Sequence, residues 1–88
     1  QRFRLDVQGH TDDSPISTER FPSNWELSAA RASAVVRYLN GIGIASERMR
    51  ATGFADTIPK VPNRDPQGNP IKVNQEENRR ITIRIFPR

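Results

Sequence analysis

The sequence contains no cysteine, which excludes disulfides, zinc–thiolate sites and a thiol nucleophile. Its longest uninterrupted apolar stretch is far below the about 20 residues that a membrane-spanning helix needs. No basic and apolar leader opens the chain, so we expect any targeting or anchoring segment to lie outside it. We therefore expect a chain that neither crosses a bilayer nor depends on a covalent brace.

Lysine is also scarce: the chain has 2 lysines and 12 arginines. Fourteen basic and ten acidic side chains give a net charge of +4 over 88 residues, a length that suits a single domain spanning 1–88. The arginine guanidinium is a planar fork suited to carboxylate or phosphate. The composition therefore indicates an anionic partner, such as nucleic acid, a membrane surface or an acidic polymer, with an ordinary solvated surface as the alternative.

Alternating apolar and polar residues predict a strand near each end of the chain. The alternating apolar residues lie at odd positions: Phe3, Leu5 and Val7 in residues 2–8, and Ile81, Ile83 and Ile85 in residues 80–86. Between them we expect a short strand over residues 49–54 and a long proline-rich loop over residues 57–75.

A helix is predicted to begin after Ser23, which is a favourable N-cap with Glu26 in the capping-box position. Gly41 and Gly43 supply the signal that ends it, and residues 45–48 are expected to form a single helical turn. Two neighbouring rows are expected to face the core: Leu27, Val35 and Leu39, and Ala30, Ala34 and Tyr38.

This order of elements predicts an α/β (α+β) two-layer sandwich, in which a mixed sheet packs on helices. Two strands that flank a helix form a βαβ unit if they are parallel. One helix covers only one face of a three-stranded sheet, so the other face needs a partner or a further helix. We therefore infer a domain trimmed at its start.

Arg31 is unusual because it continues the helical row of Leu27 and Val35. A cation in an apolar stripe is costly unless a carboxylate or an anionic ligand meets it. The alternatives are a side chain that lays its stem on the core with its guanidinium in water, and an internal ion pair.

A second polar group follows the first strand and consists of His10, Thr11, Asp12 and Asp13. Sites collect at strand ends in α/β sheets, although turn capping also explains such residues. The first turns of a helix lie beside the end of the preceding strand in a βα unit, so we expect Asp12 and Arg31 to face each other across a shallow cleft. Such a pair suits a zwitterion, with Asp12 binding an ammonium and Arg31 a carboxylate.

A third polar group, residues 76–80, lies at the entrance to the last strand. Strand alternation sends Arg79 and Arg80 to opposite faces, so only one of them can reach the same cleft. A solvated charge run is the alternative interpretation of this group.

The sequence contains few of the motifs that indicate an enzyme. His10 is the only histidine, and neither a nucleophile elbow nor a glycine-rich phosphate loop is present. The spacing of His10, Asp12 and Asp13 matches no known metal site, so we expect no metal and no cofactor. A nucleic-acid-binding basic module stays an alternative, although the aromatic residues do not interleave with a basic stripe.

Four short motifs resemble, in this order, the OmpA-like peptidoglycan-binding domain: residues 7–12 (Val-Gln-Gly-His-Thr-Asp), 27–32 (Leu-Ser-Ala-Ala-Arg-Ala), 53–55 (Gly-Phe-Ala) and 78–80 (Asn-Arg-Arg). The resemblance extends from about Phe3 to Phe86. Within that family, residues 10–13 followed by residues 21–28 are similar to the C-terminal domain of the flagellar motor stator protein MotB.

The resemblance implies a non-catalytic domain that binds the diaminopimelate residue of the peptidoglycan stem peptide and anchors a flagellar stator to the cell wall. By motif position, Asp12 would hold the ammonium of the ligand and Arg31 its carboxylate. Structural roles are kept for His10 and Asp13. The cleft would be lined by Thr11, Asn24, Leu27 and Arg79.

The same resemblance implies a periplasmic domain of a bacterial inner-membrane protein, a homodimer, and a stator partner subunit reached through a transmembrane segment upstream. Nucleic acid is not implied as a partner. The wall-anchoring domain of an outer-membrane porin or a lipoprotein stays an alternative. A peptidoglycan hydrolase is disfavoured because no second positioned carboxylate is evident. Two departures from the family are the missing strand and helix before Phe3 and the length of the loop 57–75.

Overall fold

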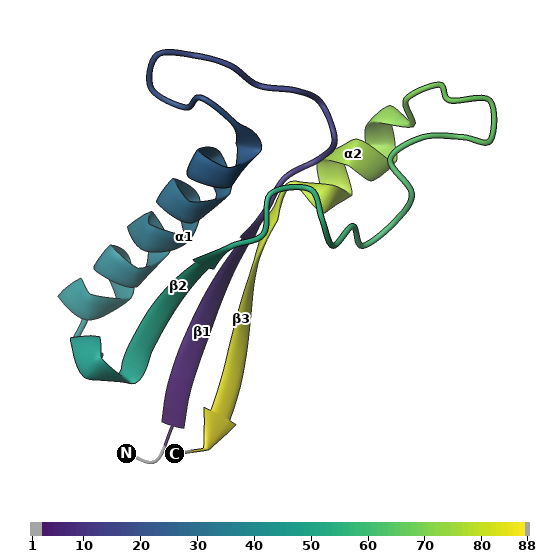
Figure 1. The fold of residues 1–88 in the computed structure, drawn as a ribbon. Helices are drawn as coiled ribbons and strands as arrows, with labels where there is room; N and C mark the ends of the chain where they lie inside the picture. Colours follow the sequence, from purple (N-terminus) through teal and green to yellow (C-terminus); the bar gives the residue numbers. More distant parts are fainter. Residues whose placement is uncertain (1–2, 88) are drawn as a thin grey trace.

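The computed structural model describes residues 3–87, and Arg2 of the expected first strand lies outside them. Its elements are β1 (Phe3–His10), α1 (Asn24–Gly41), the 3₁₀ turn η1 (Ser46–Arg48), β2 (Met49–Gly53), α2 (Lys72–Asn78) and β3 (Arg80–Pro87) (Figure 1). The sheet order is β2-β1-β3, with β1 parallel to β2 and antiparallel to β3. The mixed α/β architecture is therefore confirmed.

Helix α1 packs on one face of β1 and β2 and does not extend over β3 (Figure 1). The described residues form a thin layer of 49 × 30 × 17 Å. Within residues 3–87, no helix combines the length and apolarity that spanning a bilayer requires.

Apart from Phe86, the apolar positions of all three strands share the face on which α1 lies. Val7 pairs with Ala51 of β2 and with Ile83 of β3, as the strand alternation requires. Val7 is fully buried, whereas Ile83 is 44 % and Ile85 is 62 % exposed. The core therefore lies between α1, β1 and β2, and the apolar side of β3 is open among the described residues.

The expected cap of α1 is confirmed. The Ser23 hydroxyl accepts a hydrogen bond from the Trp25 amide and donates one to the Glu26 carboxylate. The bond from Ser23 is the main reason why the pKa of the Glu26 carboxyl lies below its ordinary 4.5. The helix ends at Gly41, and Gly43 follows with φ of +114°, a value that favours glycine.

One of the two rows expected to face the core does not. Ala30, Ala34 and Tyr38 are exposed, and the fully buried positions of α1 are Ser28 and Ala32. The row of Leu27, Val35 and Leu39 is half-buried. The helix approaches the sheet so closely that only small side chains fit along the line of contact.

The loop expected over residues 57–75 is shorter than predicted, because α2 begins at Lys72 inside it. The seven residues that follow Pro70 contain neither proline nor glycine, which leaves room for a two-turn helix. Helix α2 lies beyond the carboxyl end of β1 and leads directly into β3 (Figure 1). It therefore places new side chains next to the polar group that follows β1.

Candidate functional site

The carboxyl end of β1 is tied to α1 and to the segment after β2 by hydrogen bonds of the Ala55 main chain. The Ala55 amide donates to the Ser28 hydroxyl at 3.0 Å, and the Ala55 carbonyl accepts from the Thr11 amide at 2.9 Å. Ser28 in turn donates to the Trp25 carbonyl at 3.1 Å. These bonds hold the first turns of α1 beside Thr11.

Asp12 is the first acidic residue beyond β1, and it is 6 % exposed. Its Oδ1 accepts the Ser14 amide at 2.9 Å, and its Oδ2 forms an ion pair with the Arg79 guanidinium. The Thr11 hydroxyl donates to the Asp12 carbonyl at 2.8 Å. Each carboxylate oxygen of Asp12 therefore already has a partner.

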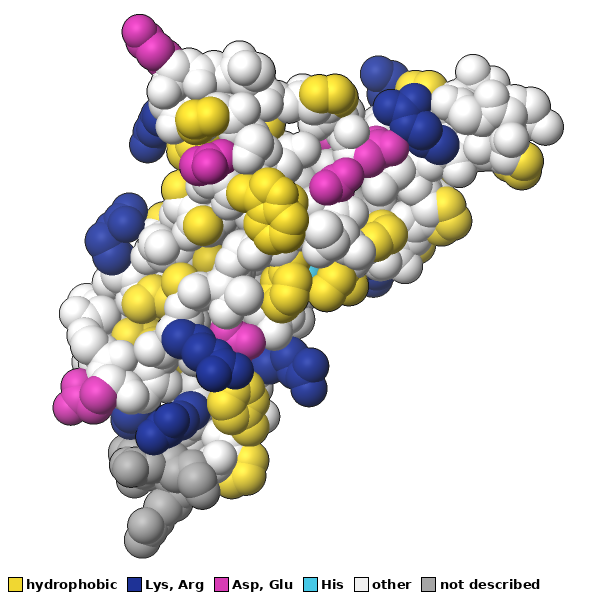
Figure 2. Space-filling view, viewed as in Figure 1, with side chains coloured by type: hydrophobic (Ala, Val, Ile, Leu, Met, Phe, Trp, Pro, Cys, Tyr) yellow, Lys and Arg dark blue, Asp and Glu magenta, His cyan; other side chains and the backbone are white. Residues whose placement is uncertain are grey.

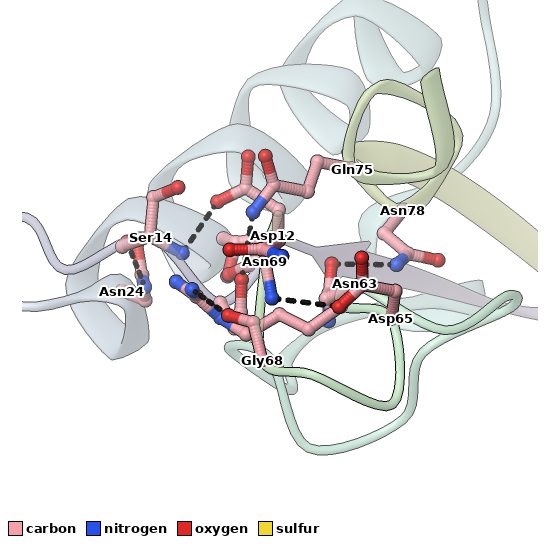
Figure 3. A network of polar contacts seen from close by, with 12 residues as sticks. Asp12, Ser14, Asn24, Asn63, Asp65, Gly68, Asn69, Gln75 and Asn78 are labelled. Carbon is pink, nitrogen blue, oxygen red and sulfur yellow. Dashed lines mark hydrogen bonds and ion pairs between the residues drawn. The ribbon is translucent and has the colours of Figure 1, made fainter. Parts of the chain in front are cut away.

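The loop after Asp12 is connected to the start of α1. The Asn24 side-chain amide donates to the Ser14 carbonyl at 3.0 Å, so Ser14 bridges Asn24 and Asp12 (Figure 3). Four of the six expected site residues, Thr11, Asp12, Asn24 and Arg79, thus belong to one hydrogen-bonded group. Leu27 lies half-buried on α1, one turn beyond Asn24.

A surface hollow opens beside Asp12 and Arg79, with α2 on its other side. Its charged lining consists of two carboxylates, Asp12 and Glu76, and two cations, Lys72 and Arg79. Such a lining can bind both an ammonium and a carboxylate. The sequence analysis did not identify Lys72 as a candidate site residue, because α2 was not expected. Glu76 was part of the third polar group, residues 76–80.

Arg31 does not share this hollow. It is exposed on α1 and lines a second hollow with Arg20, Phe21 and Arg37, which has no lining residue in common with the hollow of Asp12. Arg31 follows Asn24 by seven residues, about 10 Å along the helix axis. The expected cleft in which Asp12 faces Arg31 is therefore not formed in this structure.

The sequence left open whether Arg31, in the apolar row of α1, is ion-paired or has its guanidinium in water. Arg31 is exposed as a residue, as the alternative of a side chain with its head in water requires. None of the arginines of the second hollow forms an ion pair within residues 3–87. This hollow therefore presents three cations that no described carboxylate neutralises.

Arg79 and Arg80 diverge, and only Arg79 reaches Asp12. Arg79 directly follows α2, whereas Arg80 is the first residue of β3. The Arg80 guanidinium donates to the main-chain carbonyls of Ile58 at 3.1 Å and Asn78 at 3.3 Å. Arg80 thus holds the loop after β2, while Arg79 belongs to the candidate site.

Asp13 has the structural role expected for it. Its carboxylate accepts Arg64 Nε at 2.7 Å and Gln75 Nε2 at 2.9 Å, which joins the long loop and α2 to the end of β1. Burial would raise the pKa of the Asp13 carboxyl, but the bonds from Arg64 and Gln75 outweigh it and lower the pKa below 3.8. Asp13 therefore stabilises the position of the long loop and of α2 beside the candidate site.

His10 is also held by the fold. It is 3 % exposed, and its ring stacks on Phe54 with centroids 5.2 Å apart. Burial, followed by the charge of Arg80, lowers the pKa of His10 below 6.5, which favours the neutral imidazole. Among residues 3–87, no group of three or more His, Cys, Asp or Glu is placed to hold a metal ion.

The whole chain is similar to known proteins. The curated protein "Uncharacterized protein YtxE" of Bacillus subtilis is 46 % identical over 82 residues, which are 92 % of this chain and 31 % of YtxE. The C-terminal domain of Helicobacter pylori MotB superposes with a TM-score of 0.83 at 30 % identity, over 100 % of this chain and 62 % of that one. For the cell wall anchor of the T6SS from Pseudomonas aeruginosa, the TM-score is 0.80 at 36 % identity, over 97 % of this chain and 55 % of that one.

The chain spans about a third of the length of YtxE and of motility protein B of Helicobacter pylori, two curated relatives that it matches. The matched residues include both Asp12 and Arg79. The family match covers residues 1–83, nearly the full sequence. The chain belongs to the OmpA family.

Proposed function

We propose that this domain binds peptidoglycan non-covalently, through the diaminopimelate residue of the stem peptide, and anchors a flagellar stator complex to the cell wall. Two relatives support the proposal, because one is a MotB domain and the other is a cell wall anchor. The proposed task is binding without bond cleavage.

The observation that carries the proposal is the ion pair between Asp12 and Arg79 at the edge of a charged hollow. Asp12 is almost fully buried, yet its carboxylate lines the hollow, whereas the Arg79 side chain is 43 % exposed. An incoming ammonium can take Oδ2 of Asp12, and the released guanidinium can then meet a ligand carboxylate. A zwitterionic head group thus replaces the internal ion pair without leaving either charge unpaired.

Arg31 is proposed as a second carboxylate ligand. Its guanidinium has no ion-pair partner within residues 3–87 and is exposed, so it is free to turn toward a ligand. A stem peptide that extends from Asp12 along the first two turns of α1 reaches Arg31. We propose that Thr11, Asn24 and Leu27 shape this course.

The proposal is tested by sedimentation of the chain with purified sacculi. We expect Asp12→Ala to abolish co-sedimentation and Arg31→Ala to weaken it, while Arg37→Ala, a neighbour of Arg31 on α1, binds as the wild type does. The circular dichroism spectrum of every variant should match that of the wild type. Retained binding by Asp12→Ala would refute the proposed site.

The two arginines can be separated in the same experiment. Loss of binding in Arg79→Ala with full binding in Arg31→Ala would assign the ligand carboxylate to Arg79 alone. Release of soluble muropeptides during incubation would contradict a purely binding role. A random oligonucleotide that binds more tightly than sacculi do would favour the nucleic-acid alternative.

The proposal places the domain in the periplasm, in an inner-membrane protein that acts as a homodimer with a stator partner subunit. Each exposed charge contact is worth only about 0–1 kcal/mol, so firm anchoring requires several domains bound at once. We expect a covalently linked dimer of this chain to bind sacculi at least about tenfold more tightly than the monomer. Equal affinities would contradict anchoring by several copies.

A further inference from the structure

The face of the sheet opposite α1 is rich in arginine. Strand alternation and the register of the three strands place on it Arg4, Asp6, Gln8 and His10 of β1, Arg50 and Thr52 of β2, and Arg80, Thr82, Arg84 and Phe86 of β3. We call this set the polar sheet face. It carries four arginines and one aspartate, which accounts for most of the net charge of the chain.

Asp6 organises the polar sheet face without neutralising it. Its carboxylate accepts Gln8 Nε2 at 2.8 Å and Thr52 Oγ1 at 2.7 Å, and lies 3.4 Å from Arg50 Nε. Burial would raise the pKa of Asp6, but these hydrogen bonds and the charge of Arg50 keep it below 3.8. Asp6 therefore stays ionised and compensates a single arginine.

Two of the remaining three arginines project their charge into solvent. Arg4 and Arg84 are exposed, and neither forms an ion pair within the described part of the chain. Even the paired Arg50 side chain is 66 % exposed. Figure 2 shows several Lys or Arg side chains around one acidic side chain over the lower part of the molecule, where the strands lie.

The aromatic rings of the polar sheet face are already covered. The Arg50 guanidinium lies 5.1 Å from the centre of the Phe86 ring, and the His10 ring is stacked on Phe54. Binding of single-stranded nucleic acid depends on open aromatic rings on which bases can stack. This face thus lacks stacking platforms but keeps its arginine forks, which match phosphate oxygens in pairs.

We propose that the polar sheet face docks an anionic polymer of the cell envelope, charged through phosphodiester groups, at a distance from the stem-peptide site. Arg50 and Arg84 lie on the two strands that flank β1, about 9–10 Å apart at their Cα atoms, so they can engage two phosphates at once. This inference rests on the wall location in the proposed function. It assigns a second contact to a face that the stem peptide does not use.

The test measures binding of the chain to purified poly(glycerol phosphate) at low salt. The variant Arg4→Gln/Arg84→Gln removes two charges and leaves every bond to Asp6 intact. Because each exposed contact contributes up to about 1 kcal/mol, we expect about tenfold weaker binding. The matched control Arg37→Gln lies on α1, against the other face of the sheet, and should weaken binding less than about twofold.

A second variant changes affinity in the opposite direction. Asp6→Asn removes the one negative charge of the face and keeps an oxygen acceptor for Thr52, so it should strengthen polymer binding by a few-fold. Equal affinities of Arg4→Gln/Arg84→Gln and Arg37→Gln would overturn the proposal. A random oligonucleotide or an anionic lipid vesicle bound more tightly than the polymer would overturn the choice of partner.

Failure of this inference is distinguishable from failure of the proposed function. Asp12→Ala should bind poly(glycerol phosphate) as the wild type does. It should no longer bind sacculi from which phosphodiester-linked polymers have been removed, here called stripped sacculi. Arg4→Gln/Arg84→Gln should bind the stripped sacculi as the wild type does and should bind poly(glycerol phosphate) more weakly. If Arg4→Gln/Arg84→Gln also failed to bind the stripped sacculi, the two surfaces would not be separate and the inference would be wrong.

Discussion

The Cα of Gly9 lies directly against the main-chain carbonyl of Ser28. A Cβ at Gly9 would be 2.1 Å from this carbonyl oxygen, and a Cβ at Gly53 would be 2.7 Å from the Ala29 amide nitrogen. Helix α1 thus meets β1 and β2 backbone to backbone at their carboxyl ends. This contact sets how far the first turns of α1 lie from Asp12.

Gly9→Ala should therefore be strongly destabilising. The added methyl overlaps main chain and not a movable side chain, so we expect a loss of about 3 kcal/mol or more in the free energy of unfolding. Gly41→Ala is the matched control, because nothing lies within 4 Å of a Cβ there, and its effect should stay within about 1 kcal/mol. Urea denaturation measures both, and equal stabilities would contradict the close contact.

Ser28→Ala probes the hydrogen bond that accompanies this contact. The Ser28 hydroxyl accepts the Ala55 amide, and its removal leaves a buried donor without a partner. We expect a loss of about 1–3 kcal/mol, which lowers the melting temperature by several degrees. Ser33→Ala, on the same helix and half-buried, should melt within about 2 °C of the wild type. The idea fails if the two variants melt alike.

Much of the fold follows from local sequence patterns. The alternation around Val7 and Ile83 predicts strands that the structure extends by one or two residues, and Ser23 and Gly41 mark the ends of α1. These features depend on neighbours within a few residues, so a single sequence reveals them.

The remaining features depend on contacts between distant segments. Helix α2 has only seven residues, and its surroundings are rich in proline, so neither length nor periodicity reveals it. The pairing of Asp12 with Arg79 depends on α2, and the placement of Arg31 depends on how closely Gly9 lets the helix approach. The sequence therefore predicts the site residues individually, while the structure decides which of them meet.

Asn78 orders the loop between β2 and α2, and Asn78→Ala should release it. The fully buried side chain accepts the amides of Lys60 at 2.8 Å and Val61 at 3.0 Å and donates to the Val61 carbonyl. It also donates to the side chain of Asn63 (Figure 3). We expect a loss of about 2–3 kcal/mol, with faster hydrogen exchange at the two amides.

Asn74→Ala is the control for Asn78→Ala. Asn74 donates a single bond, to the Pro62 carbonyl at 3.0 Å, so its loss should cost about 1 kcal/mol or less. Unchanged exchange in Asn78→Ala would show that the loop is held by other contacts.

His10 predicts how stability depends on pH. Burial and the nearby Arg80 lower its pKa below 6.5 in the folded state, while the unfolded chain binds a proton at the ordinary value. The unfolded state thus holds more protons below about pH 6.5, so stability is full above that pH and is lost as the pH falls toward the folded-state pKa. The slope should approach 1.4 kcal/mol per pH unit at most.

Urea denaturation between pH 7.5 and pH 5.5 measures this slope, and no other histidine contributes to it. In His10→Phe the ring can still stack on Phe54, and the buried Nδ1, which has no hydrogen-bond partner among residues 3–87, is removed. We expect the stability of this variant to be flat over the same range. A flat wild-type profile would mean that the imidazole is accessible to protons in the folded state, in conflict with its burial beside Phe54.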